Sequence, residues 1–293
     1  MTGSILPPER PPKHPGVEFG RSADDLPVAR VGDLVFAMVA GRRGECFLAS
    51  AWRVQRPLAE FRRDDFYSHH GSVADEAAFR DRMIEQAEHS RQLAGLARQS
   101  VRMNCNTPWG PSQGATVYAD GIVAHTTAGH GGFKLSPARN AKVHPMLRAG
   151  DGYYEEDECW AVVAFTFPDL FTSYERRCAE RTVKDSFPDA WEAVSGEALL
   201  PGESRVNDRR AFEDEHAGDW IVMSAILSDH HPGMMEVVAV LGGKYVDGAE
   251  ERRFLVPSTE YEVGRFGFVI DPKRHAIYDG PSGFIGWQRR QAS

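Results

Sequence analysis

The chain has 293 residues and a formal net charge of −8, with 42% hydrophobic and 26% charged residues. This length can bury a large core, and no run approaches the roughly 18 consecutive apolar residues that a membrane span needs. The negative charge disfavours broad nonspecific binding to nucleic acid, because that binding depends on neutralising phosphates with Lys and Arg. We therefore expect a globular protein of one or two domains that binds neither membranes nor bulk nucleic acid.

Residues 1–30 are rich in proline and charge, and we expect them to form a flexible arm. The first residues contain no apolar segment of the kind found in signal peptides, so we expect a cytoplasmic protein. The four cysteines lie far apart without a C-x-x-C pair, which argues against a zinc ribbon or a disulfide framework.

Residues 31–104 are predicted to form a β-hairpin followed by a long helix. The apolar stretches LVFAMVA and ECFLASAWRV flank a turn at 41–44, which is typical of a hairpin. Ser72 and Asp75 resemble a capping box, and apolar residues recur at helical spacing after them as far as Gln99.

Residues 105–198 are predicted to form a central domain. Asp120-Gly121 lies between two alternating stretches, which indicates a second hairpin. The segment 155–167 has acids at its start and apolar residues at helical spacing, so we predict a helix there. Thr172 with Glu175 predicts the start of another helix, and the sequence PDAWEAV predicts a short one after it.

Residues 199–293 are predicted to contain a charged helix near Asn207–His216 and four strands near 221–227, 236–241, 252–256 and 266–270. This region either forms a separate α+β unit or continues the central domain. Strands and helices alternate without a βαβ repeat along the chain, so we predict an α+β fold with a mixed or antiparallel sheet and several packed helices.

The most unusual segment is Thr107–Leu135, TPWGPSQGATVYADGIVAHTTAGHGGFKL. It contains Trp109, Gln113, His125, His130 and six glycines within 29 residues. Glycine lets the backbone approach a ligand, while histidine and glutamine bring hydrogen-bond donors and acceptors. The segment therefore marks a candidate site.

A metal centre is one hypothesis for this site. His125, His130 and His144, with a carboxylate from Glu155, Glu156 or Asp157, would supply the nitrogen and oxygen ligands of a zinc or manganese hydrolase. The alternative is structural: His130 occupies a tight glycine turn, His125 pairs with a neighbouring strand, and the acids cap a helix. No H-E-x-x-H pattern is present to decide between the two.

A site without metal is a second hypothesis. His130 would act as the general base, and Lys134 or Gln113 would stabilise a developing oxyanion. The candidate residues for binding the substrate are backbone groups of the glycine loop and two aromatic rings: Trp109, Gly129, Gly131, Gly132 and Tyr154. A third hypothesis, a thiol–imidazole pair of Cys105 and His130, is opposed by Pro108, which favours extended chain rather than a helix start after the cysteine.

The order of several motifs resembles an uncharacterised family that is encoded largely on plasmids and other mobile elements of Alphaproteobacteria and their relatives. The similarity covers about residues 107–196, with a looser likeness at Gly264–Pro272. The motifs that carry it are Thr107-Pro108-Trp109-Gly110-x-x-Gln113, His130-Gly131-Gly132, Lys134-Leu135-Ser136, Asn140, Glu155-Glu156-Asp157, Phe167-Pro168 and Asp189-Ala190-Trp191. The family is a domain of unknown function, so the resemblance implies a context and no mechanism.

Two functions remain open from the sequence. The first is an accessory protein of a mobile element with a glycine-lined polar pocket that hydrolyses phosphodiesters, with zinc or manganese as the candidate cofactor. The second is a non-catalytic acidic module that binds a host defence or DNA-processing protein, through the acids at 155–158 and 213–215.

Overall fold

The computed structural model describes residues 15–41, 44–53, 55–244 and 249–284. Its contacts divide the chain into two compact units, Met1–Arg181 and Thr182–Ser293. Every strand pair in the described residues is antiparallel, and helices accompany each of the larger sheets, which confirms the predicted α+β fold. In the described part of the chain, no helix combines the length and the apolar character that crossing a membrane requires.

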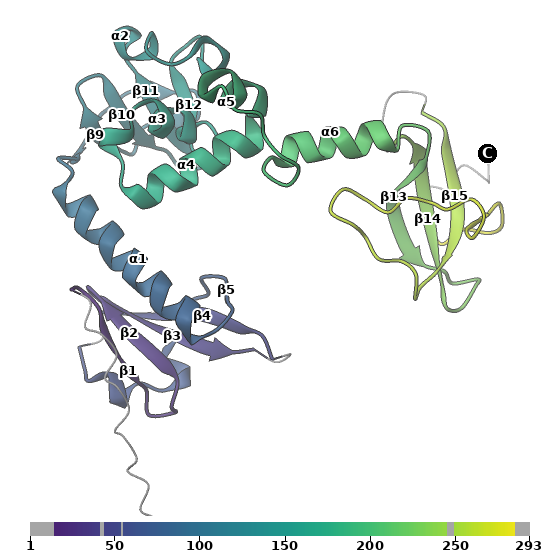
Figure 1. Cartoon of the computed structure of the whole chain (residues 1–293), viewed down its shortest axis with the longest axis horizontal. Helices are drawn as coiled ribbons and strands as arrows, with labels where there is room; N and C mark the ends of the chain where they lie inside the picture. The colour runs from purple at the N-terminus through teal and green to yellow at the C-terminus, as the bar shows by residue number, and fades with distance from the viewer. Residues whose placement is uncertain (1–14, 42–43, 54, 245–248, 285–293) are drawn as a thin grey trace, which may run out of the picture. The chain divides into compact units, whose positions relative to one another are not determined.

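The first unit begins with a five-stranded sheet in which every strand pairs with the next one along the chain (Figure 1). Its strands are β1 (Glu18–Arg21), β2 (Pro27–Val31), β3 (Leu34–Ala40), β4 (Cys46–Trp52) and β5 (Ser72–Val73). The predicted hairpin is confirmed as β3 and β4, although residues 42–43 of its turn lie outside the described residues.

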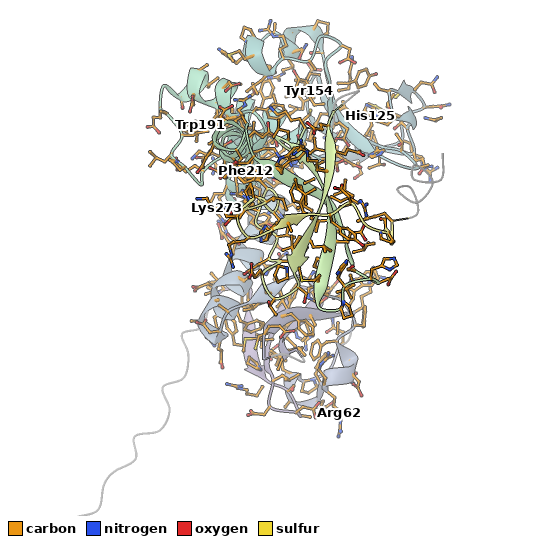
Figure 2. The ribbon with its side chains drawn as sticks, turned by 90° about the vertical axis from the view of Figure 1, so that its right-hand side faces the viewer. Arg62, His125, Tyr154, Trp191, Phe212 and Lys273 are labelled. Carbon is orange, nitrogen blue, oxygen red and sulfur yellow. The ribbon has the colours of Figure 1, made fainter. Side chains whose placement is uncertain are left out.

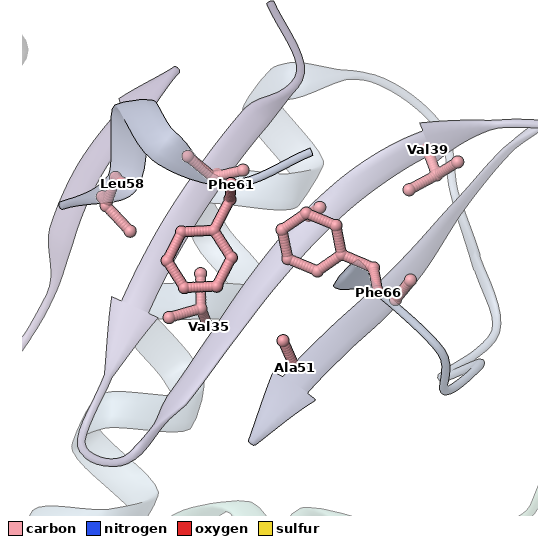
Figure 3. Close-up of a cluster of buried hydrophobic side chains, with 9 residues drawn as sticks. Val35, Val39, Ala51, Leu58, Phe61 and Phe66 are labelled. Atoms are coloured by element: carbon pink, nitrogen blue, oxygen red, sulfur yellow. The ribbon is translucent and has the colours of Figure 1, made fainter. Parts of the chain in front are cut away.

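Both faces of this sheet are covered, which explains why its strands are apolar at successive positions rather than at alternate ones. On one face Phe61 and Phe66, from the segment after β4, pack over Val35 and Ala51 (Figure 3). The other face packs against the helix α1 (Glu76–Gly95) through Phe79, Met83 and Ala87.

Two predictions for the N-terminal region need correction. We expected a flexible arm over residues 1–30, but this segment contains β1 and the first part of β2, in which Val28 and Ala29 are buried. Residues 1–14 lie outside the described residues. The helix is capped by Asp75, whose carboxylate accepts a hydrogen bond from the Ala78 N–H at 2.8 Å. Ser72, expected to start the helix, belongs to β5 instead.

A second five-stranded sheet forms the centre of the first unit. Its order is β12-β11-β10-β9-β6, with β6 (Gln99–Val101), β9 (Gly114–Ala119), β10 (Ile122–Thr126), β11 (Gly131–Leu135) and β12 (Tyr153–Glu155). The predicted hairpin at Asp120-Gly121 is confirmed as β9 and β10, and Gly121 has the positive φ of 73° that its turn requires. A small separate hairpin, β7 (Asn106–Thr107) and β8 (Gly110–Pro111), precedes β9.

The helices that follow agree with the patterns that predicted them. α3 (Trp160–Thr166) is confirmed, and its Ala161, Val162 and Val163 are buried. α4 (Ser173–Ser186) begins with the predicted capping box, in which Thr172 and Glu175 exchange side-chain to backbone hydrogen bonds. α5 (Pro188–Ser195) is the short helix expected from PDAWEAV.

The second unit contains α6 (Arg205–Glu215) and a four-stranded sheet in the order β13-β14-β15-β16. Its strands are β13 (Trp220–Leu227), β14 (Met234–Leu241), β15 (Glu251–Pro257) and β16 (Ala276–Ile277). The helix and the first three predicted strands are confirmed. The strand expected at 266–270 is wrong, because this segment joins β13 only through the Ile221–Val269 bridge and flanking hydrogen bonds.

Candidate functional site

The candidate site lies at one end of the central sheet, where β11 begins and β12 ends. In the antiparallel register Gly132 of β11 stands opposite His125 of β10 on one side and Glu155 of β12 on the other. Residues that stand directly opposite each other share a face of the sheet, so His125 and Glu155 flank Gly132 on the same face. Figure 2 labels His125, which β10 carries.

Trp109 occupies the space over Gly132. A Cβ atom added to Gly132 would lie 2.5 Å from Cη2 of the Trp109 ring and 2.3 Å from the backbone oxygen of Tyr154. The Trp109 ring also meets the Tyr153 ring edge-on, with 5.8 Å between centroids. The β7–β8 hairpin therefore folds onto this face of the sheet, and its indole lies over the residue that separates His125 from Glu155.

Three side chains meet at the edge of this arrangement. The metal-binding atoms of His130, Glu155 and Asp157 all lie within 4.8 Å of one another. His130 directly precedes β11, and its Nδ1 is 3.5 Å from Oε1 of Glu155. The Thr127 hydroxyl donates to the His130 carbonyl at 2.6 Å, which holds the turn that presents the imidazole.

Glu155 is oriented by the backbone that follows it. Its Oε2 accepts a hydrogen bond from the Asp157 N–H at 3.0 Å. Its Oε1 is buried and has no hydrogen-bond partner among the described residues, although it faces His130. A buried carboxylate oxygen without a donor is costly. The geometry therefore leaves one oxygen of Glu155 ready to accept a proton donor or a metal ion.

The glycines of the loop do not form the backbone cradle that the sequence led us to expect. Gly131 and Gly132 are buried, and a Cβ on Gly131 would lie 2.5 Å from Oε2 of Glu156 and 2.7 Å from the His125 carbonyl oxygen. Close packing therefore explains both glycines, and it leaves little room for a ligand on their backbone. Gly129 is exposed, with open space where its Cβ would lie.

His125 stands across Gly132 from Glu155 and makes different contacts. Only 5% of its surface is exposed, and burial lowers the pKa of its imidazole. Its Nδ1 is 3.1 Å from the Ser112 hydroxyl and 3.9 Å from Sγ of Cys105. The thiol that we considered as a partner of His130 thus contacts His125.

All of these residues fall within one recognised sequence domain. The chain contains a DUF7007 domain, a domain of unknown function, over residues 102–217. No curated protein and no solved structure matches the chain. The DUF7007 domain includes the expected region of resemblance, 107–196, and extends it at both ends.

Other residues of the DUF7007 domain that we expected at the site are directed elsewhere. Gln113 is exposed, and its backbone N–H donates to Thr126. His144 precedes a short 3-10 turn, Pro145–Leu147, and its buried Nδ1 has no partner among the described residues. The Glu156 carboxylate lies against Gly131 at the start of β11. Glu156 is not part of the group formed by His130, Glu155 and Asp157. Of the three histidines expected to bind a metal, only His130 lies close to Glu155 and Asp157 among the described residues.

We also expected Lys134 and Tyr154 at the site, but both make other contacts. Lys134 donates to the Asp151 carbonyl at 2.6 Å and lies over the Tyr153 ring, beside a separate hollow of about 270 Å³. Tyr154 is 1% exposed, its hydroxyl donates to Oδ1 of Asn140 at 2.6 Å, and Figure 2 labels it. Tyr154 therefore belongs to the core, and Lys134 supports the turn before β12.

Proposed function

We propose that the DUF7007 domain binds one divalent metal ion, manganese or zinc, through His130, Glu155 and Asp157, and uses it to hydrolyse a phosphodiester. The observation that carries this proposal is the group of three ligand atoms within 4.8 Å of one another. Tetrahedral ligands at about 2.0–2.2 Å from a shared ion lie roughly 3.3–3.6 Å apart. The 3.5 Å between His130 Nδ1 and Glu155 Oε1 already matches this spacing, and the exposed Asp157 side chain is free to approach them.

Charge and ligand type support this choice of ion. The group has two carboxylates and one imidazole, which suits manganese or zinc better than a soft metal. Without a cation the two carboxylates repel each other, and the neighbouring Glu156 and Glu158 add to this negative charge. A divalent ion balances the two ligand charges and gives the buried Oε1 of Glu155 a partner, which it lacks among the described residues.

The chemistry follows from the openness of the group. Three protein ligands leave coordination positions for a water molecule and a phosphate oxygen, as in catalytic metal sites. A bound ion would supply Lewis-acid chemistry there, acidifying a water molecule and withdrawing charge from the phosphate. Glu156, whose carboxylate lies against Gly131, would accept the proton of the attacking water and return it to the leaving oxygen. One P–O bond would form from the water oxygen while the P–O bond to the leaving oxygen breaks.

The biological context in this proposal rests on the resemblance of the motif order to a family carried by mobile elements. We propose an accessory protein of a mobile genetic element that acts in the cytoplasm. A phosphodiester hydrolase fits that setting, because the transfer and defence of mobile DNA both depend on cutting phosphodiester bonds.

Metal binding to the full chain tests the proposal directly. Titration calorimetry with MnCl₂ and ZnCl₂ should give one site in the wild type, with affinity reduced at least tenfold in Glu155→Gln and Asp157→Asn. Glu158→Gln is the matched control, since it removes a neighbouring exposed acid outside the group. Hydrolysis of bis(4-nitrophenyl) phosphate should follow metal occupancy. Equal metal binding by the wild type and both ligand variants would overturn the proposal.

A second candidate function is the acidic binding module. Two groups of neighbouring acids are exposed: Glu156, Asp157 and Glu158, and, at the end of α6, Asp214 and Glu215. Such a surface attracts a basic protein partner, for which a host defence or DNA-processing protein is the class we propose. This function needs the charges and not the His130 imidazole, which separates it from the hydrolase.

A further inference from the structure

Cys105 has the surroundings of a reactive thiol. It is exposed, and its carbonyl accepts a hydrogen bond from the Ser112 N–H at 2.9 Å, which closes the base of the β7–β8 hairpin. This closure holds the Cys105 Sγ 3.9 Å from Nδ1 of His125. The exposed Cys105 thiol is thus held next to the buried His125 imidazole.

The imidazole is held beside the thiol in its neutral form. Burial lowers the pKa of His125, so the imidazole is unprotonated at neutral pH, and its Nδ1 faces the Cys105 thiol. Across the sheet its neighbours are Ala115 and Gly132, and the Trp109 ring lies over Gly132. None of these side chains carries a charge, but the Glu156 carboxylate lies near the His125 backbone, because Glu156 Oε2 and the His125 carbonyl oxygen both border the Cβ position of Gly131. Cys105 is the titratable group that faces Nδ1, together with the hydroxyl of Ser112.

We propose that Cys105 is a site of mixed-disulfide formation with the disulfide of a small thiol, and that His125 acts as its base. The Cys105 thiol gives its proton to Nδ1 of His125, and the thiolate attacks one sulfur of the small disulfide. A bond forms between Sγ and that sulfur, the original S–S bond breaks, and the leaving thiolate takes the proton from His125. The reaction balances without another oxidant.

The other three cysteines are not paired with Cys105, so none of them would displace the small thiol from its mixed disulfide. Cys46, Cys159 and Cys178 are all half-buried and free, and none is paired with Cys105. The chain therefore offers an internal comparison between an exposed thiol that faces an imidazole and three half-buried thiols.

The test measures the reaction of the full chain with oxidised glutathione, with the modified peptide identified by mass spectrometry. Cys105 should react at least tenfold faster than Cys159, and His125→Asn should slow Cys105 about tenfold or more. Cys178→Ser, which removes a half-buried thiol elsewhere in the chain, is the control and should leave the rate at Cys105 unchanged. Cys105→Ser should abolish the modification at this peptide.

The pH profile of the wild type keeps the test decisive if His125→Asn does not fold. The rate of a thiol without a base falls about tenfold per pH unit below its pKa of about 8.5. With His125 as the base, the rate at Cys105 should change less than threefold between pH 6.5 and 8. A tenfold fall per unit over this range, or equal rates at Cys105 and Cys159, would overturn the proposal.

Discussion

Arg98 and Glu175 form a two-pronged ion pair, in which Nη1 donates to Oε1 at 2.9 Å and Nη2 donates to Oε2 at 2.7 Å. The two residues are 77 positions apart, and their side chains are only 13% and 19% exposed. The Arg98 guanidinium also lies over the Tyr118 ring and donates to the Leu170 carbonyl. The pair therefore ties the chain that leaves α1 to the first turn of α4.

This pair predicts a dependence of stability on pH. Burial alone would raise the pKa of Glu175, but hydrogen bonds from Arg98 and the Thr172 N–H, with the Arg98 charge, hold it below its ordinary value. A folded-state pKa below the unfolded value of 4.5 stabilises the fold above that pH, and this contribution is lost as the pH falls through the folded-state pKa. Glu175→Gln should therefore lower the free energy of unfolding by about 2 kcal/mol at pH 7.

Urea unfolding followed by circular dichroism at pH 7 and at pH 3 measures this effect. The difference between wild type and Glu175→Gln should shrink at the lower pH. Glu250→Gln, which breaks the exposed pair with Arg252, should cost about 0.5 kcal/mol or less. A Glu175→Gln cost that stays constant with pH would contradict the role of the Glu175 charge.

Gly132→Ala should destabilise the first unit strongly. The added Cβ would lie 2.3 Å from the Tyr154 backbone oxygen and 2.9 Å from Cα of Glu155, and backbone atoms cannot move aside cheaply. We expect a cost above about 2 kcal/mol in thermal or urea unfolding. Gly129→Ala, which meets open space three residues earlier, should change stability by less than about 0.5 kcal/mol. Similar effects of the two substitutions would mean that Trp109 and β12 do not close on Gly132.

Tyr154→Phe separates a core role from a role in substrate binding. Removing the hydroxyl leaves Oδ1 of Asn140 without its donor and the Ala149 N–H without its acceptor. The expected cost is about 1–3 kcal/mol of stability, with catalytic constants of any hydrolase activity unchanged in the folded fraction. Tyr153→Phe, on the half-buried neighbour, is the control and should cost less. A change in KM without a loss of stability would return Tyr154 to the substrate site.

Charge reversal distinguishes the acidic binding module from the hydrolase. Asp214→Lys and Glu215→Lys alter exposed acids at the end of α6, outside the His130 group, so they should weaken capture of a basic partner and leave metal binding intact. Capture should also weaken between 50 and 300 mM salt, because exposed charges are screened over roughly 8 Å at physiological ionic strength. His130→Ala should have the opposite effects. Pull-down from host lysate and metal titration of the same variants measure both.

Local patterns predicted most of the fold. The hairpins at β3–β4 and β9–β10 and the helices α1, α3, α4, α5 and α6 follow from alternation, helical spacing and capping residues within a few positions. The strands β1 and β2 were missed because proline and charge dominate their surroundings, while their burial depends on β3 and the segment after β4. The segment 266–270 has a strand-like composition, yet it forms no strand.

The candidate site was harder to predict because its limits are set by tertiary packing. An acid at the end of one strand and a histidine just before the adjacent strand lie together once the register is known, as Glu155 and His130 do. His125 stands in the same row of the sheet as Gly132 and Glu155, and the Trp109 ring lies over Gly132. No local sequence pattern predicts where the β7–β8 hairpin, which carries Trp109, packs. The burial of Tyr154 could not be predicted for a related reason, since a three-residue strand is too short to reveal which face is buried.

The packing of Trp109 on Gly132 makes the sizes of these two residues depend on each other. An indole at position 109 excludes a side chain at position 132, while a small residue at 109 would leave a void that a methyl or larger group at 132 could fill only after β12 shifts. Among chains that share this arrangement, side-chain volumes at the two positions should therefore vary in opposite directions. Glycine at position 132 therefore depends on the indole above it, and a small residue at position 109 would remove the ring that lies over the residue between His125 and Glu155.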